Sequence, residues 1–182
     1  MKKVMLIGDS IRLGYQEQVA KNLEGIAEVW GSEDNCRFAK YTLNELGRMF
    51  EACGKPDVIH WNNGLWDTSI VYPEDGSFTS VDEYLRDMSR ILRELRKVTD
   101  KIIFATTTPV KPQNPNQKNE IITEYNKHIT MMMEKENVII NDLNALVSSH
   151  IDQYICEDHI HLNEAGKIVC GRRVADEILK IL

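Results

Sequence analysis

The chain has 182 residues, and its 22 basic and 28 acidic side chains give a net charge of −6. This length predicts one domain, spanning residues 1–182, that buries a core without a metal or a disulfide. The acidic balance argues against nucleic acid as a partner, and no apolar run reaches the roughly 20 residues that cross a membrane.

Short apolar runs alternate with longer amphipathic segments, which is typical of an α/β protein with a mostly parallel sheet. Five runs are rich enough in Val, Ile or aromatic residues to be strands covered on both faces. The predicted strands are Lys3–Ile7, Ile26–Trp30, Val58–Trp61, Lys101–Thr106 and Val138–Asn141.

The segments between these strands carry apolar residues at helical spacing. The clearest is Val81–Val98, which follows a good N-cap residue, Ser80. The other predicted helices are Gln16–Leu23, Thr42–Cys53, Gln117–Glu136 and a last one from Asn163 onward.

Two loops are longer than a connection requires, Asn62–Thr79 after the third strand and Thr107–Asn119 after the fourth. Loops at the carboxyl ends of parallel strands surround the ligand crevice of such sheets. We therefore expect both loops to shape a pocket.

The first predicted strand ends in Gly8-Asp9-Ser10-Ile11. A serine at this point projects from a strand-to-helix turn toward the crevice, which makes Ser10 a candidate nucleophile. The alternative is that Ser10 only caps the following helix. Asp9 is expected to bond to nearby backbone amides and to steady the turn.

A second polar cluster, Glu157-Asp158-His159-Ile160-His161, precedes the last helix. The three-residue spacing lets the Asp158 carboxylate hold the Nδ1–H of His161, which leaves Nε2 free to take a proton from a serine. His159 is a competing base, but it is adjacent to Asp158 and is expected to point away from whatever His161 faces, so His161 is favoured. A metal site of His159 and His161 with His60 and Asp67 lacks the usual ligand spacing, so no metal is expected.

The two motifs together, Gly8-Asp9-Ser10-Ile11 and Asp158-His159-Ile160-His161, resemble those of the SGNH, or GDSL-like, hydrolase superfamily of esterases and lipases. The resemblance spans almost the whole chain. It implies a three-layer α/β/α, flavodoxin-like sandwich, with Ser10 as nucleophile, His161 as base and Asp158 as its orienting partner. It implies no cofactor.

The superfamily's oxyanion hole combines the serine N–H, a glycine N–H and an asparagine side chain, and here the sequence departs from that pattern. The glycine position falls at Cys36, whose backbone N–H would be the donor. The third block reads Trp61-Asn62-Asn63-Gly64-Leu65-Trp66-Asp67. Aligning Gly64 puts Trp66 at the asparagine position, so Asn62, Asn63 or the Trp66 indole supplies the last donor. The asparagines are favoured, unless they only form a turn.

These residues predict a serine esterase that acts by acyl transfer on a small-molecule ester. The loop Thr107–Asn119 is polar, and Trp61 and Trp66 suit stacking on a sugar ring, so the expected substrate carries an acetyl-type group on a carbohydrate or similar polar molecule. Arg12 or Arg37 could bind an anionic substrate group.

Two kinds of alternative remain open. A non-catalytic protein could keep the fold and bind a ligand in the crevice, and a lysophospholipase or thioesterase would share the superfamily's motifs. A nucleotide-binding protein is disfavoured because Gly8-Asp9-Ser10 lacks both a Gly-x-Gly-x-x-Gly run and a Walker lysine.

The four cysteines are widely spread, which argues against a disulfide framework or a zinc finger. The apolar run Val4–Ile7 ends at Gly8 and is too short for a signal peptide, so a cytoplasmic location is expected. The sequence does not indicate an oligomeric state.

Overall fold

The computed structural model describes residues 1–182 and has one five-stranded sheet in the order β2-β1-β3-β4-β5, with every neighbouring pair parallel. The strands are β1 (Lys2–Ile7), β2 (Ala27–Gly31), β3 (Val58–Trp61), β4 (Ile102–Ala105) and β5 (Ile139–Asn141). This strand order is that of flavodoxin-like sheets, so the expected α/β/α sandwich is confirmed.

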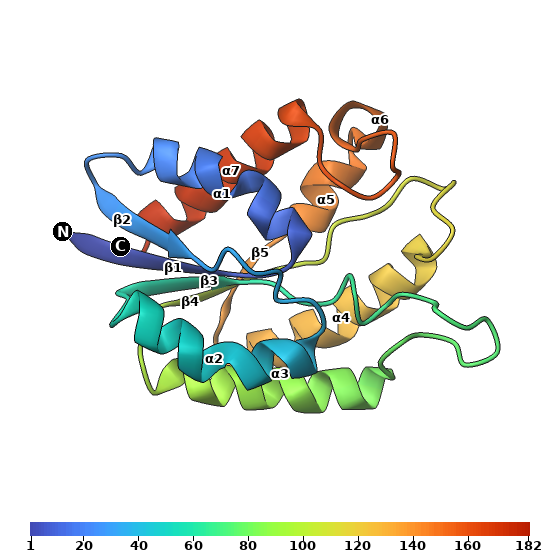
Figure 1. The fold of residues 1–182 in the computed structure, drawn as a ribbon, viewed down its shortest axis with the longest axis horizontal. Coiled ribbons are helices and arrows are strands. Elements are labelled where there is room, and N and C mark those ends of the chain that lie inside the picture. Colours follow the sequence, from blue (N-terminus) through green and yellow to red (C-terminus); the bar gives the residue numbers. More distant parts are fainter.

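Helices cover both faces of the sheet, as Figure 1 shows: α1, α5 and α7 lie on one face and α2, α3 and α4 on the other. The helices are α1 (Ser10–Asn22), α2 (Ala39–Cys53), α3 (Val81–Arg96), α4 (Asn119–Lys135), α5 (Leu143–Ser148), α6 (Ile151–Tyr154) and α7 (Glu164–Leu179).

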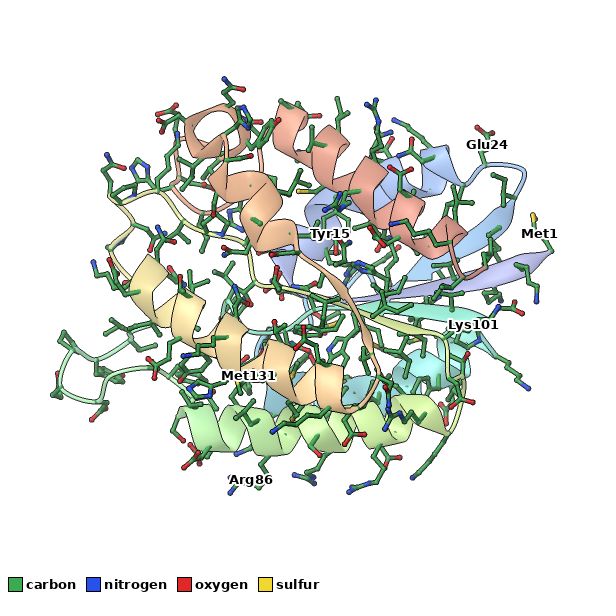
Figure 2. All side chains as sticks on the ribbon, turned by 180° about the vertical axis from the view of Figure 1, so that it is seen from behind. Met1, Tyr15, Glu24, Arg86, Lys101 and Met131 are labelled. Atoms are coloured by element: carbon green, nitrogen blue, oxygen red, sulfur yellow. The ribbon has the colours of Figure 1, made fainter.

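The sheet separates two apolar cores, because the pleat directs alternate side chains of each strand to opposite faces. The residues of β3 and β4 are all buried, which explains why these strands are predominantly apolar, with His60 of β3 as their one polar residue. Figure 2 shows Tyr15 inside the molecule, between the sheet and the helices, whereas Arg86 points away from the opposite helical layer.

The predicted strands are confirmed to within one residue at each end, and Ser80 caps α3 by accepting a hydrogen bond from the Glu83 N–H. The start of α1 was predicted six residues too late. Its buried face contains Arg12, which interrupts the apolar periodicity. The short helices α5 and α6 were not predicted.

The carboxyl ends of the strands meet at one edge of the sheet, from which the long loop after β3 extends (Figure 1). The loop that follows β4 lies beside it, because the Ile70 N–H donates to the Asn116 carbonyl at 2.7 Å. In this strand order, ligands bind at the carboxyl ends of β1 and β3, because the connections that follow these two strands leave for opposite faces of the sheet. No helix is long and apolar enough to cross a membrane.

Candidate active site

Ser10 is the first residue of α1 and follows directly from the end of β1. Asp9 caps the helix, since its carboxylate accepts a hydrogen bond from the Ile11 N–H at 2.9 Å. The Ser10 N–H has no acceptor within the chain. The turn thus presents both a hydroxyl and a free backbone donor at the edge of the sheet.

Three side chains from the two sequence motifs lie in a row. His161 Nε2 is 2.9 Å from Ser10 Oγ, and His161 Nδ1 is 2.7 Å from an oxygen of Asp158. Both distances lie within the range expected between a nucleophile, its base and the group that orients the base. A carboxylate at Nδ1 favours the imidazole tautomer whose Nε2 carries no proton and can accept a hydrogen bond from the Ser10 hydroxyl.

Asp158 is held as a carboxylate by its own turn. Partial burial acts to raise its pKa, but hydrogen bonds from the backbone N–H groups of Ile160 and His161, with the imidazole itself, lower the pKa to about 2. With its pKa lowered in this way, the Asp158 carboxyl is ionised at neutral pH.

The turn that carries His161 is closed by backbone hydrogen bonds. The Cys156 N–H donates to the His161 carbonyl at 2.8 Å, and Ile155 pairs with Leu162 in an antiparallel bridge. His159 has a left-handed backbone, with φ 69°, and its Nδ1 is buried without a partner. His161, rather than His159, therefore faces Ser10.

The structure contradicts the prediction that the Cys36 N–H completes the oxyanion hole. This N–H donates instead to the Gly8 carbonyl at 3.3 Å. The Cys36 side chain is 2% exposed and its sulfur lies 3.9 Å from that of Met49. Cys36 therefore joins two loops and does not face a substrate.

The Asn63 side chain is also committed elsewhere. Its Oδ1 accepts from the Trp61 indole at 2.7 Å, while its Nδ2 donates to Thr42 Oγ1 at 2.8 Å and to the Arg37 carbonyl at 3.0 Å. Because the Asn63 side chain makes all these bonds inside the protein, the prediction that it is the side-chain oxyanion donor is wrong.

Asn62 and Trp66 remain as candidates. The Asn62 side chain lies against Gly8, and its Oδ1 is buried without a donor. Trp66 lines the pocket beside Ser10 and is 40% exposed. Gly64 has φ 145°, and a Cβ there would be 2.2 Å from Thr107 Oγ1, so this glycine allows the loop to pass close to the end of β4.

Asp9 lies behind Ser10 with no exposed surface. Burial raises the pKa of its carboxyl, and the Ile11 N–H, the Arg12 charge and the Asn62 amide oppose that rise. The expected role of Asp9, bonding to a backbone amide of the turn, matches the contact with Ile11.

A pocket of about 340 Å³ adjoins Ser10 and His161. Both long loops contribute to it, as the sequence predicts, and the turn Asp158–His161 adds Ile160, which the sequence did not point to. Its remaining lining residues are Leu65, Trp66, Ser69, Ile70, Val71, Asn116 and Gln117. Apart from the imidazole, no ionisable side chain lines this pocket.

The two candidate arginines do not line the pocket. Arg12 has no exposed surface, so its assignment to an anionic substrate group is wrong. The Arg37 guanidinium stacks on the Tyr41 ring, 4.7 Å from its centre.

His60 and Asp67 are both buried inside the fold. Burial lowers the pKa of His60 to about 3, which keeps it neutral, and its Nε2 lies 3.1 Å from the Asn141 amide. Asp67 accepts the Ala39 N–H at the start of α2. No three His, Cys, Asp or Glu side chains converge in a way that could hold a metal ion.

No protein-family model and no curated protein sequence matches the chain. Solved structures do resemble it. A lipase/acylhydrolase from Enterococcus faecalis superposes with a TM-score of 0.85 at 20% identity, covering 98% of this chain and 95% of that one. The acetylxylan esterase Axe2 from Geobacillus stearothermophilus has a TM-score of 0.81 at 18% identity, over 97% and 94% of the two chains. The acetyl xylan esterase AlAXEase has a TM-score of 0.78 at 22% identity, over 98% of each.

These likenesses extend over nearly the full length of each chain. At such identities they establish the fold and not the chemistry. The chain has the fold of the SGNH hydrolases, as the resemblance of its two short motifs predicts.

Proposed function

We propose that the protein is a serine ester hydrolase. The observation that carries this proposal is the row of contacts from Asp158 through His161 to Ser10, with distances of 2.7 Å and 2.9 Å. Solved structures with the same fold are described as acylhydrolases and esterases, which supports the same reaction class.

In the proposed reaction, Ser10 Oγ attacks the ester carbonyl carbon while His161 Nε2 takes the hydroxyl proton. The tetrahedral intermediate collapses as His161 returns that proton to the departing alcohol. Water then attacks the acyl-serine, His161 again accepting and returning the proton, and the carboxylic acid leaves. Asp158 stays ionised throughout and stabilises the imidazolium.

The negative charge on the carbonyl oxygen needs hydrogen-bond donors in both steps. The free Ser10 N–H at the start of α1 is one, and the helix dipole adds to its effect. We assign the side-chain donor to Asn62, because Asn63 Nδ2 makes two hydrogen bonds within the protein. Asn62 interacts through its amide with the Asp9 carboxyl and lies against the turn that carries Ser10.

The proposed substrate is a small acyl ester, of the acetyl type, on a carbohydrate or similar polar molecule. The pocket has no lysine or arginine, which disfavours esters and thioesters whose alcohol or thiol carries phosphate. Ser69, Asn116 and Gln117 offer hydrogen bonds to hydroxyl groups, and Trp66 offers a ring face. Two similar structures are described as acetylxylan esterases.

The test compares wild type with Ser10→Ala on p-nitrophenyl acetate and on a fluorophosphonate probe. The expected result is turnover and labelling in wild type and loss of both in the variant. A wild type that shows neither would instead support a ligand-binding protein with this fold.

The substrate class needs a separate measurement. Release of acetate from acetylated xylo-oligosaccharides is compared with hydrolysis of p-nitrophenyl laurate and of a lysophospholipid. A higher kcat/KM for the lipid or the long-chain ester would overturn the small-acyl proposal while leaving the hydrolase proposal intact.

A further inference from the structure

The reaction described above gives no role to Arg12, a cation with no exposed surface only two residues after Ser10. A guanidinium is charged at any pH at which proteins fold. Burying it costs much free energy unless its N–H groups all find acceptors. The acceptors that Arg12 uses therefore indicate what it holds together.

The Arg12 guanidinium connects the serine turn to the loop after β2. Its Nε and Nη2 both donate to the Gly8 carbonyl, at 3.3 Å and 3.1 Å. Its Nη2 also donates to the Asp34 carbonyl at 2.9 Å. Its Nη1 donates to the Ser32 carbonyl and to Gln16 Oε1, each at 2.6 Å.

Gly8 is confined on both sides by this arrangement. A Cβ at Gly8 would be 2.0 Å from Asn62 Oδ1 and 2.7 Å from Arg12 Cβ. The Gly8 carbonyl also accepts the Cys36 N–H. The turn from Gly8 to Ser10 is therefore clamped between Asn62 and Arg12.

The positive charge of Arg12 is not neutralised by a bonded carboxylate. The oxygens that it binds are three backbone carbonyls and one amide, and its fifth neighbour is the Cys36 sulfur at 3.9 Å. Asp9, the nearby carboxyl, accepts its hydrogen bond from the Ile11 N–H instead. In a buried site a fixed charge of this kind acts more strongly than it would in water.

We propose that Arg12 is a positioning residue for Ser10. It fixes the turn so that the Ser10 N–H points at the substrate's carbonyl oxygen, and its buried charge favours the negative charge that develops there. This role rests on the proposed hydrolase function. It predicts that changes at Arg12 act on the chemical step and not on substrate binding.

The test uses Arg12→Lys, which keeps the charge but loses the planar fork, and Gln16→Leu, which removes one acceptor and leaves Arg12 in place. Arg12→Lys is expected to lower kcat on p-nitrophenyl acetate by up to about 100-fold with KM unchanged, because small displacements of reacting groups have effects of that size. Gln16→Leu should give a smaller, severalfold fall. Fluorophosphonate labelling of Ser10 should slow in parallel.

Met88→Ala is the matched control, because it opens a cavity in the core on the opposite face of the sheet. It should lower Tm while leaving kcat per folded molecule at the wild-type value. If Arg12→Lys does not fold, the test rests on Gln16→Leu, for which kcat on p-nitrophenyl acetate and the rate of fluorophosphonate labelling are both measured.

Three outcomes would overturn the proposal. One is wild-type kcat in the folded variants, and another is a raised KM at unchanged kcat, which would indicate substrate contact. The third is an equal fall of kcat in Met88→Ala, which would indicate general destabilisation. If wild type shows neither turnover nor labelling, both the proposed hydrolase function and the proposed role of Arg12 are wrong. If wild type is active and the variants are unaffected, only the proposed role of Arg12 is wrong.

Discussion

The two halves of the candidate site are held in place in different ways. Ser10 lies on a turn whose neighbours Asp9 and Arg12 have no exposed surface and whose contacts reach distant loops. The side chains of Asp158 and His161 are 48% and 45% exposed, and the bonds that orient them lie within one short turn. The position of Ser10 therefore depends on contacts between segments distant in sequence, whereas the orientation of His161 depends on the local backbone geometry of its own turn.

Because of this difference, substitutions in the two halves should affect catalytic activity and folding stability differently. A change in the exposed half should remove activity at little cost to folding, because few buried contacts are lost. A change in the buried half should lower both, since the same contacts hold the turn and the core.

His161→Ala should lower kcat by about 10⁶-fold, as loss of the base does in other serine hydrolases. Its free energy of unfolding should stay within about 0.5 kcal/mol of wild type, because the side chain is half exposed. Steady-state kinetics and urea unfolding measure the two quantities. His128→Ala, an exposed position in α4, is the control and should change neither. A large loss of stability in His161→Ala would contradict the expected difference between the two halves.

Asn62→Ala should lower kcat by about 10² to 10³-fold, the usual effect of losing one oxyanion donor. Trp66→Phe removes the indole N–H but keeps a ring at the pocket, so it should mainly change KM for a sugar ester. If Trp66→Phe loses kcat and Asn62→Ala does not, the side-chain donor is the indole.

Gly8→Ala should destabilise the fold by about 1–3 kcal/mol, because the added methyl group overpacks the space between Asn62 and Arg12. It should lower kcat as well. The matched control is Gly47→Ala in α2, where a Cβ meets nothing within 4 Å, and there a gain of about 0.5–1 kcal/mol is expected. Urea unfolding measures the free energy of unfolding of both variants. Equal values for Gly8→Ala and Gly47→Ala would contradict the inference that the turn is clamped.

Asp67→Asn should change how stability depends on pH. Burial raises the pKa of Asp67 to about 7, against the opposing effect of hydrogen bonds from Thr79 and Ala39. Since the folded pKa exceeds the unfolded one, wild type should lose stability relative to Asp67→Asn as pH rises from about 4 to about 7. The slope should be at most about 1.4 kcal/mol per pH unit, with no further loss above that range. Urea unfolding of both proteins from pH 5 to pH 8 gives the difference, and a constant difference would contradict the raised pKa.

The sequence predicted the sheet and the principal helices well, because buried strands and amphipathic helices have distinct periods. It predicted the start of α1 poorly. The buried face of α1 carries Arg12 beside Ile11, Tyr15 and Val19, and a buried cation is read from sequence as an exposed position.

The candidate site was predictable where its contacts are local. The three-residue spacing of Asp158 and His161 sets their contact, and the end of β1 sets the place of Ser10. The oxyanion donors were not predictable in the same way. Whether the Cys36 N–H or the Asn63 amide is free depends on partners such as Gly8 and Thr42, which only the fold brings near.

The contact between His161 and Ser10 joins positions 151 residues apart in sequence. At the usual rate of about 5–20 residues per second, a ribosome that has just added the serine needs about 8 to 30 s to reach the histidine. Throughout that interval the nascent chain carries the hydroxyl without the imidazole, so the proposed base cannot activate the proposed nucleophile. Hydrolytic activity would begin only when the last part of this segment has been made and has docked beside α1.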